Sequence, residues 1–507
     1  MPIRITGLNS GLDTDSIIKS LSSSYQTKID NVKRKQSDIQ YKMDSWSELN
    51  KKLYSFYGKT LSNNRYQNNL STMKAETSSE SVSVSASAEA IKGNHKLQVI
   101  ETAQTGYITS RKLDNINKDS KLNDLGLSSG MYKFNGQEIT VDENTTVSSF
   151  VNTLNKNGVN ASFDNIQNRF FISAKESGEN ADFDLSENKT SKELLSIMGL
   201  DRSYYLGDDG NYYSDKDKTK KIEDKDLIND IKSGNAAVRI SGRDSEILLD
   251  GVSFKNNSND ISVNGLSINI KDKTNENIDI NVNEDTSATF DKIKGLIDEY
   301  NSLMNEMSKA YNTSRDGYKS LTDEEKDAMS DKEIEKWEEK LKSSALYRDS
   351  SLYSVMSRMR EASLGSITMK DGNKKTLNDF GITSKSYLSA SADERYTLDI
   401  DENKLKNAIE QNGEETTSFF NELSKKLYSA IDKAMSGPAS LSSKYKVYND
   451  KALLSQKDSY DKDISKLEEK MQKEQDKYYK QFAAMESALS KMNSQSNYFS
   501  SFFNTKI

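Results

Sequence analysis

Two stretches near opposite ends of the chain repeat apolar residues at alternating spacings of three and four, and this pattern restricts the possible folds more than any other feature. The first covers residues 25–57, with only Gln36 and Asn50 as polar interruptions. The second covers residues 460–499, with a slip of one residue near positions 474–475. Such spacing is typical of helices that pair along one face, and a slip changes the supercoil locally. The sequence therefore predicts two long terminal helices that pack together or against copies of themselves.

The start of the first helix is visible in the stretch SGLDTDSIIKSL. Gly11 breaks the chain, Asp13 or Thr14 can cap the free amides, and Asp15 suits the positive end of the helix dipole. An apolar stripe follows at once. The side chains that we expect to carry coiled-coil packing and assembly on the two helices are Ile17, Leu21, Ile29, Val32, Ile39, Met43, Ile464, Leu467, Met471, Met485, Leu489 and Met492.

The composition favours an elongated chain of several domains. Only 34% of the 507 residues are hydrophobic, 29% are charged, and the mean hydropathy is -0.81, which leaves little apolar material for one large core. A net charge of -7 argues against nucleic acid as a partner. No apolar run is long enough for a membrane helix, and the first residues have no apolar signal region, so we expect neither membrane insertion nor a cleaved signal peptide.

Residue usage excludes most catalytic chemistry. The chain has no cysteine and one histidine, His95, which lies in an alternating stretch and is expected at a solvent-facing strand position. This removes thiolate nucleophiles, Cys or His metal clusters and catalytic triads. Within residues 206–226, the spacing of Asp208, Asp209, Asp215 and Asp217 does not match a calcium loop, and the segment is interpreted as a mobile loop. We therefore expect no enzyme activity, no metal and no cofactor.

The middle of the chain is predicted to be rich in β-strands. From about residue 72 to 285, short alternating runs are separated by Gly, Asn and Asp, and Asn135-Gly136 and Asn264-Gly265 are hairpin turn signals. One helix is expected over residues 147–158, capped by Thr145 or Thr146.

Helical periodicity returns after residue 286. Helices are expected at 290–311, 322–342, 346–362, 403–411 and 416–435, with a β-like pair formed by SITMK and YTLDID. The fold class is therefore α+β, elongated and multi-domain. The β-rich part is expected to be inserted between helical segments, so that the first and last helices of the chain belong to the same helical part. The expected domains are a terminal coiled-coil leg (1–45 and 456–507) that orders only on assembly, a helical shoulder (46–72 and 286–455), a β-rich head (73–107 and 236–285) and an outer β-rich head (108–235).

Five blocks of sequence resemble one known family. The opening GLNSGLDTDSIIKSL and the ending FAAMESALSKMNSQSNYFSSFF are similar to the terminal signatures of the flagellar filament cap, or hook-associated protein 2, family. DSEILLDGVSF with DEYNSLMNEM, and LYRDSSLYSVMSRMREASLG with TLNDFGIT, resemble its returning part. The stretch that begins YKFNGQEITV is similar to a small repeat of flagellin-related proteins. The blocks keep the family's order, whereas residues 206–226 and 318–342 match nothing recognisable.

The resemblance implies a structural cap at the distal tip of a bacterial flagellum. Members form a small ring, promote flagellin polymerisation, adjoin the hook-associated junction proteins and leave the cell through the flagellar export channel. A dedicated export chaperone binds the C-terminal region in this family, so its expected contact residues here are Phe482, Phe499, Phe502 and Phe503. Two alternatives remain open at this point: a surface adhesin whose β-rich head binds a host or matrix ligand, and a hook–filament junction protein.

Overall fold

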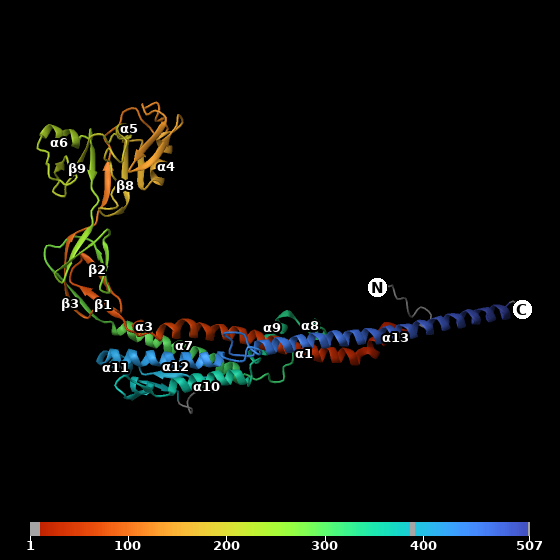
Figure 1. Cartoon of the computed structure of the whole chain (residues 1–507). Coiled ribbons are helices and arrows are strands. Elements are labelled where there is room, and N and C mark those ends of the chain that lie inside the picture. Colours follow the sequence, from red (N-terminus) through yellow and green to blue (C-terminus); the bar gives the residue numbers. More distant parts are fainter. Residues whose placement is uncertain (1–10, 386–390, 505–507) are drawn as a thin grey trace. The chain divides into compact units, whose positions relative to one another are not determined.

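The computed structural model describes residues 11–385 and 391–504, without the side chains of residues 67–68 and 501–504 (Figure 1). The chain divides into two compact units. Residues 1–71 and 286–507 form the first unit, which is mainly helical, and residues 72–285 form the second, which is mainly β. The α+β fold predicted from the sequence, with a β-rich part inserted between helical parts, is confirmed.

The first unit contains the long helices and a few short strand pairs. Its helices are α1 (Thr14–Ser55), the π-helical η1 (Phe56–Leu61), α2 (Ser62–Asn64), α3 (Gln67–Leu70), α7 (Thr286–Asn312), α8 (Asp323–Asp327), α9 (Asp331–Ser343), α10 (Ser350–Leu364), the 3-10 helix η2 (Leu377–Phe380), α11 (Glu402–Gln411), α12 (Gly413–Met435) and α13 (Asp450–Asn504). Its strands are β17 (Ile367–Thr368), β18 (Lys374–Lys375), β19 (Ile382–Ser384) and β20 (Leu398–Ile400).

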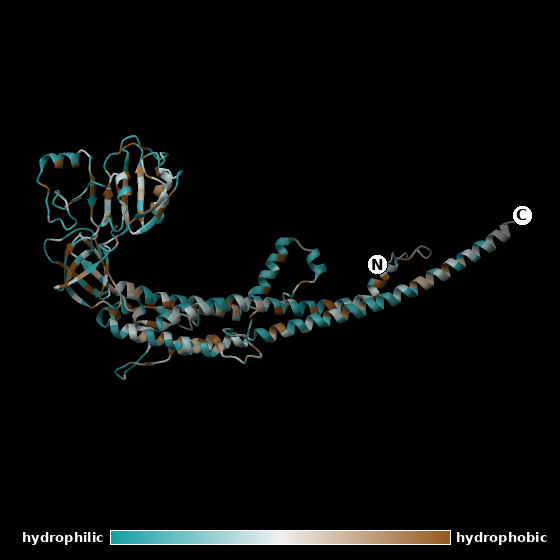
Figure 2. Ribbon diagram, turned by 45° about the horizontal axis from the view of Figure 1, so that its top comes forward, coloured by the Kyte–Doolittle hydropathy of each residue, from teal (hydrophilic) through white to brown (hydrophobic). Residues whose placement is uncertain are grey.

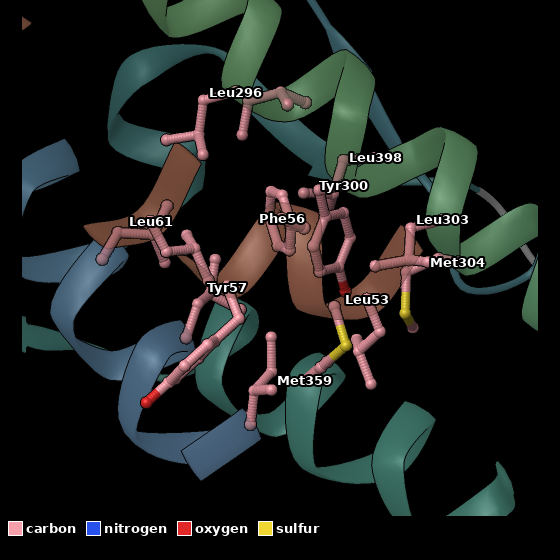
Figure 3. Close-up of a cluster of buried hydrophobic side chains, with 14 of the residues drawn as sticks. Leu53, Phe56, Tyr57, Leu61, Leu296, Tyr300, Leu303, Met304, Met359 and Leu398 are labelled. Atoms are coloured by element: carbon pink, nitrogen blue, oxygen red, sulfur yellow. The ribbon is translucent and has the colours of Figure 1, made fainter. Parts of the chain in front are cut away.

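The hydrophobic core of the first unit forms where the end of α1 meets α7, α10 and α12. Leu53, Phe56 and Leu61 are each at most 1% exposed and face α7 and α10 (Figure 3). Tyr300 of α7 is fully enclosed, and its hydroxyl lies 3.1 Å from Ser363 Oγ. The apolar spacing of α1 therefore continues into a true core.

The beginning of α1 follows from its local sequence. Asp13 caps the helix and accepts hydrogen bonds from the backbone amide of Ser16, at 3.1 Å, and from its hydroxyl, at 2.7 Å. These bonds hold the pKa of Asp13 below its usual value. Gly11 has a φ of +71°, which favours glycine. The predicted cap is thus confirmed at Asp13.

One part of the second unit is a β-sandwich around a core of Leu97, Val99, Ile247, Ile268 and Val282. Its larger sheet has the order β1-β16-β3-β12-β13 and its smaller sheet the order β14-β15-β2, all with antiparallel neighbours. The strands are β1 (Met73–Thr77), β2 (Val82–Ala86), β3 (Gly93–Glu101), β12 (Ser245–Leu249), β13 (Val252–Asn256), β14 (Asp260–Val263), β15 (Leu266–Ile270) and β16 (Ile278–Glu284).

The other part of the second unit has its own core, which includes Phe134, Phe150 and Phe170. A six-stranded sheet of order β10-β9-β11-β4-β8-β7 accompanies the hairpin β5-β6. The elements are β4 (Thr105–Thr109), β5 (Gly130–Phe134), β6 (Gln137–Val141), α4 (Val147–Lys156), β7 (Val159–Asp164), β8 (Arg169–Ser177), α5 (Lys192–Ile197), β9 (Ser203–Leu206), β10 (Tyr212–Tyr213), α6 (Lys225–Lys232) and β11 (Ala237–Ile240).

The predicted turns and the predicted helix of this unit are confirmed. Asn135-Gly136 and Asn264-Gly265 both have two successive positive φ angles, as a two-residue hairpin requires. Thr146 caps α4 with a capping box that it forms with Ser149.

Three sequence interpretations are wrong. Residues 206–226 are folded: β10 pairs with β9, and Asp215 accepts hydrogen bonds from Thr219 and Lys220. Short side-chain to backbone bonds of this kind fix a polar loop without an apolar core. The stretches SITMK and YTLDID do not pair with each other, because β17 pairs with β18 and β20 with β19. The helix expected at 322–342 is broken into α8 and α9, each with its own capping box.

Candidate functional site: the paired terminal helices

Helices α1 and α13 pack side by side and run antiparallel (Figure 1). Near the start of α1, Tyr479 donates a 2.7 Å hydrogen bond to Asp15. One turn earlier in α13, Gln475 Nε2 donates to Ser22 Oγ at 3.1 Å. Further in, Gln36 Nε2 donates to a carboxylate oxygen of Asp461. These contacts join residues more than 400 positions apart, so the leg pairs the two ends of one chain.

Most of the predicted seam residues lie between the two helices. Ile29 is 2% exposed and Ile464 is 8% exposed. The seam side chains that remain beside α1 are half-buried, as a two-helix pair without a third layer allows; they are Ile17, Val32, Ile39, Met43, Leu467 and Met471. Met485 and Leu489 continue the seam and are also half-buried, but the register places them past Thr14, the first residue of α1. Hydrophobic residues recur singly between hydrophilic ones along both helices (Figure 2).

Two residues of the predicted set lie outside the intrachain seam. Leu21 is 47% exposed, and the seam position beside it is held by Ser22 at 3% and by Ile18 at 2%. When the spacing of three and four is continued backwards from Tyr25, it places Ser22 and Ile18 in the seam. The sequence therefore indicated the correct position, but the residue at that position is a serine and not an apolar residue. Met492 is 63% exposed because α1 begins at Thr14, which leaves that part of α13 without an α1 residue beside it.

The distal part of α13 extends past the first residue of α1 (Figure 1). Residues 491–500 are all exposed, and Tyr498 and Phe499 are 65% and 62% exposed. Phe482, in contrast, is half-buried in the paired part. The side chains of Phe502 and Phe503 lie outside the described residues. An exposed row of large apolar side chains on one helix is costly in water and marks a contact surface.

The slip predicted in the second seam coincides with a broadened contact. Residues 474–476 of α13 are three consecutive half-buried positions, whereas in residues 460–471 exposed residues separate the covered ones at intervals of three and four. Gln475 in this broadened turn is the residue that reaches Ser22. The irregular spacing therefore places a polar contact where a strict repeat would place an apolar one.

A charged segment covers a second stripe of α1. Arg34 pairs with Glu325 at 2.7 Å, Lys33 with Asp323 at 3.2 Å, and Asp38 with Arg315 at 2.8 Å. The partners of α1 in these pairs lie within residues 315–325, which end inside α8, and Ser45 Oγ donates to the carbonyl of Lys342 at 3.1 Å. Residues 318–342, which resembled nothing in the sequence, together with Arg315 therefore contact α1 mainly through ion pairs.

The chemistry of this site is that of association. Across the described residues, no group of three or more His, Cys, Asp or Glu side chains is arranged to hold a metal ion. The helices in the described ranges also include none that is long and apolar enough to cross a bilayer. The pair of α1 and α13 has a half-buried apolar face and an exposed helical extension, and both can contact another chain.

Comparisons with known proteins match both ends of the chain. The family described as "Flagellar hook-associated protein 2 N-terminus" matches residues 10–106, and "Flagellar hook-associated protein 2 C-terminus" matches residues 242–494. A flagellar hook-associated protein 2 from Halalkalibacterium halodurans is 24% identical over 443 residues, which cover 80% of this chain and 77% of the relative. One from Thermotoga maritima is 28% identical over 300 residues, covering 58% and 41%.

A solved structure has a similar fold. The crystal structure of the flagellar cap protein FliD D1-D2-D3 domains from Escherichia coli covers 76% of this chain and 95% of its own, with a TM-score of 0.50 and 17% identity. The two family matches together identify the chain as a structural protein of the bacterial flagellum. The chain belongs to the flagellar hook-associated protein 2 family, the family of the filament cap.

Proposed function

We propose that this chain self-assembles into a small ring at the distal tip of the flagellar filament and promotes the polymerisation of flagellin beneath it. The α1·α13 pair acts as the leg that contacts flagellin and the junction proteins. The helices α7 and α10, which the sequence placed in a shoulder, supply the contacts between subunits in the ring. The part of α13 that extends past α1 orders fully only when the ring forms.

The observation that carries this proposal is the exposed extension of α13. Met485 and Leu489 are half-buried although the register places them past Thr14, the first residue of α1, and Met492 and Phe499 are exposed beyond them. Their spacing continues the seam, so the extension can enter a coiled-coil contact with another chain in the same way as the paired part does. An isolated helix of this length gains most of its stability from such packing.

Export through the flagellar channel follows from the same proposal. A chain that is threaded unfolded cannot rely on preformed disulfides, and this chain has no cysteine. We propose that an export chaperone covers the exposed apolar part of α13, around Phe499, Phe502 and Phe503, with Phe482 at the inner edge of its site. Capping does not require the β unit to bind a host or matrix ligand, so such binding would be a separate property of that unit.

The test uses the variants Met485→Asp and Leu489→Asp in a strain without its own cap protein. A charge at either position removes apolar contact at the end of the leg and adds a desolvation cost. We expect both variants to be produced and exported but to fail to support filaments, with a loss of ring particles in mass photometry of the purified full chain.

Ser487→Asp is the matched control, because Ser487 lies between the two positions on the same helix and is exposed. It should support normal filaments. Normal filaments with Leu489→Asp would refute the role of the leg. Normal filaments with lost surface attachment in a strain that lacks the whole chain would instead indicate an adhesin.

A further inference from the structure

Polar side chains occupy the α1 seam at a regular interval. The spacing of three and four places Ser22, Gln36 and Asn50 at seam positions, each 14 residues, or two heptads, from the next. Ser22 and Asn50 are 3% and 4% exposed. A buried polar group costs free energy unless it is hydrogen-bonded. The Ser22 hydroxyl already donates to the carbonyl of Ile18 at 2.8 Å within its own helix, whereas the side-chain amide of Asn50 depends on partners outside α1.

The partners keep the same interval on the returning segment. Ser22 contacts Gln475, and Gln36 contacts Asp461. Asn50 forms two bonds of 3.1 Å with the chain just before α13: its Nδ2 donates to the carbonyl of Tyr445, and its Oδ1 accepts from the amide of Val447. The partner positions 447, 461 and 475 are again 14 residues apart, so one antiparallel register satisfies all of these contacts together.

Other registers lose these contacts. A slip of one heptad would move Gln475 and Asp461 away from Ser22 and Gln36, so both of these contacts between the helices would be lost. A slip of two heptads would bring Gln36 beside Gln475 and so replace one polar contact by another. Asn50 would then lose its bonds to Tyr445 and Val447, which lie in the segment before α13. Asn50 therefore fixes the absolute position, and the outer two residues maintain the register along the leg.

We propose that Ser22, Gln36 and Asn50 are register pins that hold α1 and α13 of one chain in a single antiparallel alignment. Polar residues at seam positions are known to specify register and pairing at a cost in stability. The leg then enters an assembly as a preformed hairpin and does not exchange helices with a second copy. This role of the leg rests on the proposed function, whereas the register is a property of the free chain.

Disulfide trapping can read the register because the chain has no native cysteine. The pair Ser22→Cys with Gln475→Cys reports the observed alignment, and Ser22→Cys with Glu468→Cys reports a slip of one heptad. Ser22→Cys alone reports pairing between two copies. Full-length protein is oxidised, denatured and separated without reductant, so that intrachain and interchain products migrate differently.

The decisive variant is Gln36→Leu in each of these backgrounds. Asp461 is exposed, so this change leaves no unpaired group in the interior. The share of the 22–475 product should fall about fivefold relative to slipped and interchain products, as expected for a preference weakened by about 1 kcal/mol. Gln36→Lys is the matched control, because its ammonium group can still pair with Asp461, and it should keep the native product.

An unchanged single product with Gln36→Leu overturns the proposal, provided that circular dichroism shows the same helix content. Slipped or interchain products that equal or exceed the 22–475 product with Gln36 intact overturn it as well. Filament growth with the same variants is scored separately. Loss of capping with an intact register would count against the proposed function of the leg, and loss of register with intact capping would count against the need for a preformed hairpin.

Discussion

The two halves of α1 have the same apolar spacing but different environments. In the inner half, Trp46, Leu49 and Leu53 are between 1% and 4% exposed, and Trp46 stacks on Tyr448 with ring centroids 5.0 Å apart. In the outer half, most seam residues, such as Val32 and Ile39, are only half-buried. The inner half meets several helices in one core, whereas the outer half has α13 on one stripe and ion pairs on another. The spacing defines which face of the helix is apolar, and the number of neighbouring helices decides how deeply that face is buried and how much it stabilises the fold.

Truncating one seam residue in each half should give the largest contrast. Leu53→Ala leaves a cavity in a closed core and should lower the free energy of unfolding by about 2–5 kcal/mol. Ile39→Ala removes a side chain that keeps part of its contact with water, and should cost about 1–2 kcal/mol. Native-state hydrogen exchange resolves the two regions. Equal losses of protection in both would mean that the leg is as tightly packed as the core.

The polar seam residues provide a smaller contrast. Asn50→Leu leaves the carbonyl of Tyr445 and the amide of Val447 without their partner, which should cost about 1–3 kcal/mol. Gln36→Leu leaves only the exposed Asp461, so stability should change by less than about 0.5 kcal/mol. Denaturant unfolding of both variants provides the measurement. A similar cost at both positions would contradict the difference in burial on which the comparison rests.

Between pH 5 and 8, a change of pH should act mainly on the second unit, and this is the smallest effect. Asp13 and Glu325, two carboxyl groups that bond to α1, have a lowered pKa and stay ionised throughout this range. The prediction of a solvent-facing position for His95, the only histidine of the chain, is wrong. Its Nδ1 lies 2.7 Å from Asp250 Oδ2 and its Nε2 lies 3.0 Å from the carbonyl of Ile91. The bond to Asp250 raises the pKa of His95, and the same bond lowers the pKa of Asp250.

The sign follows from these two directions. Protonated His95 stabilises the β-sandwich below its unfolded pKa of about 6.5, and this contribution is lost as the pH rises through the raised folded value. The contribution of Asp250 is lost as the pH falls through its lowered folded value. Because the side chain of Asp250 is 49% exposed, we expect less than about 1 kcal/mol between pH 5 and 8.

His95→Gln should flatten the pH dependence of unfolding in the second unit, since histidine is the only side chain whose ordinary pKa lies in this range. The Leu53 and Ile39 regions serve as internal controls. A pH dependence of similar size in the first unit would show that other groups dominate, and would remove His95 as the cause.

Several local features could be predicted because short-range chemistry decides them. The cap at Asp13, the hairpin turns at Asn135 and Asn264, and the helix after Thr146 all depend on residues within a few positions of one another. The terminal seams were predicted from their spacing, and the family from blocks that keep their order. The place of Ser22 in the seam is not predicted because the predicted seam begins at Tyr25, one step after Ser22.

The amino-acid sequence alone determined that this protein has two long amphipathic terminal helices, a β-rich insertion and no cysteine or histidine chemistry, because spacing and composition are properties of the chain. Only the tertiary structure decided that the two helices pair antiparallel with each other, that Ser22, Gln36 and Asn50 meet partners at matching intervals, and that α13 extends past α1. Such facts depend on contacts between residues hundreds of positions apart. No local pattern specifies which of several compatible faces and registers the folded chain adopts.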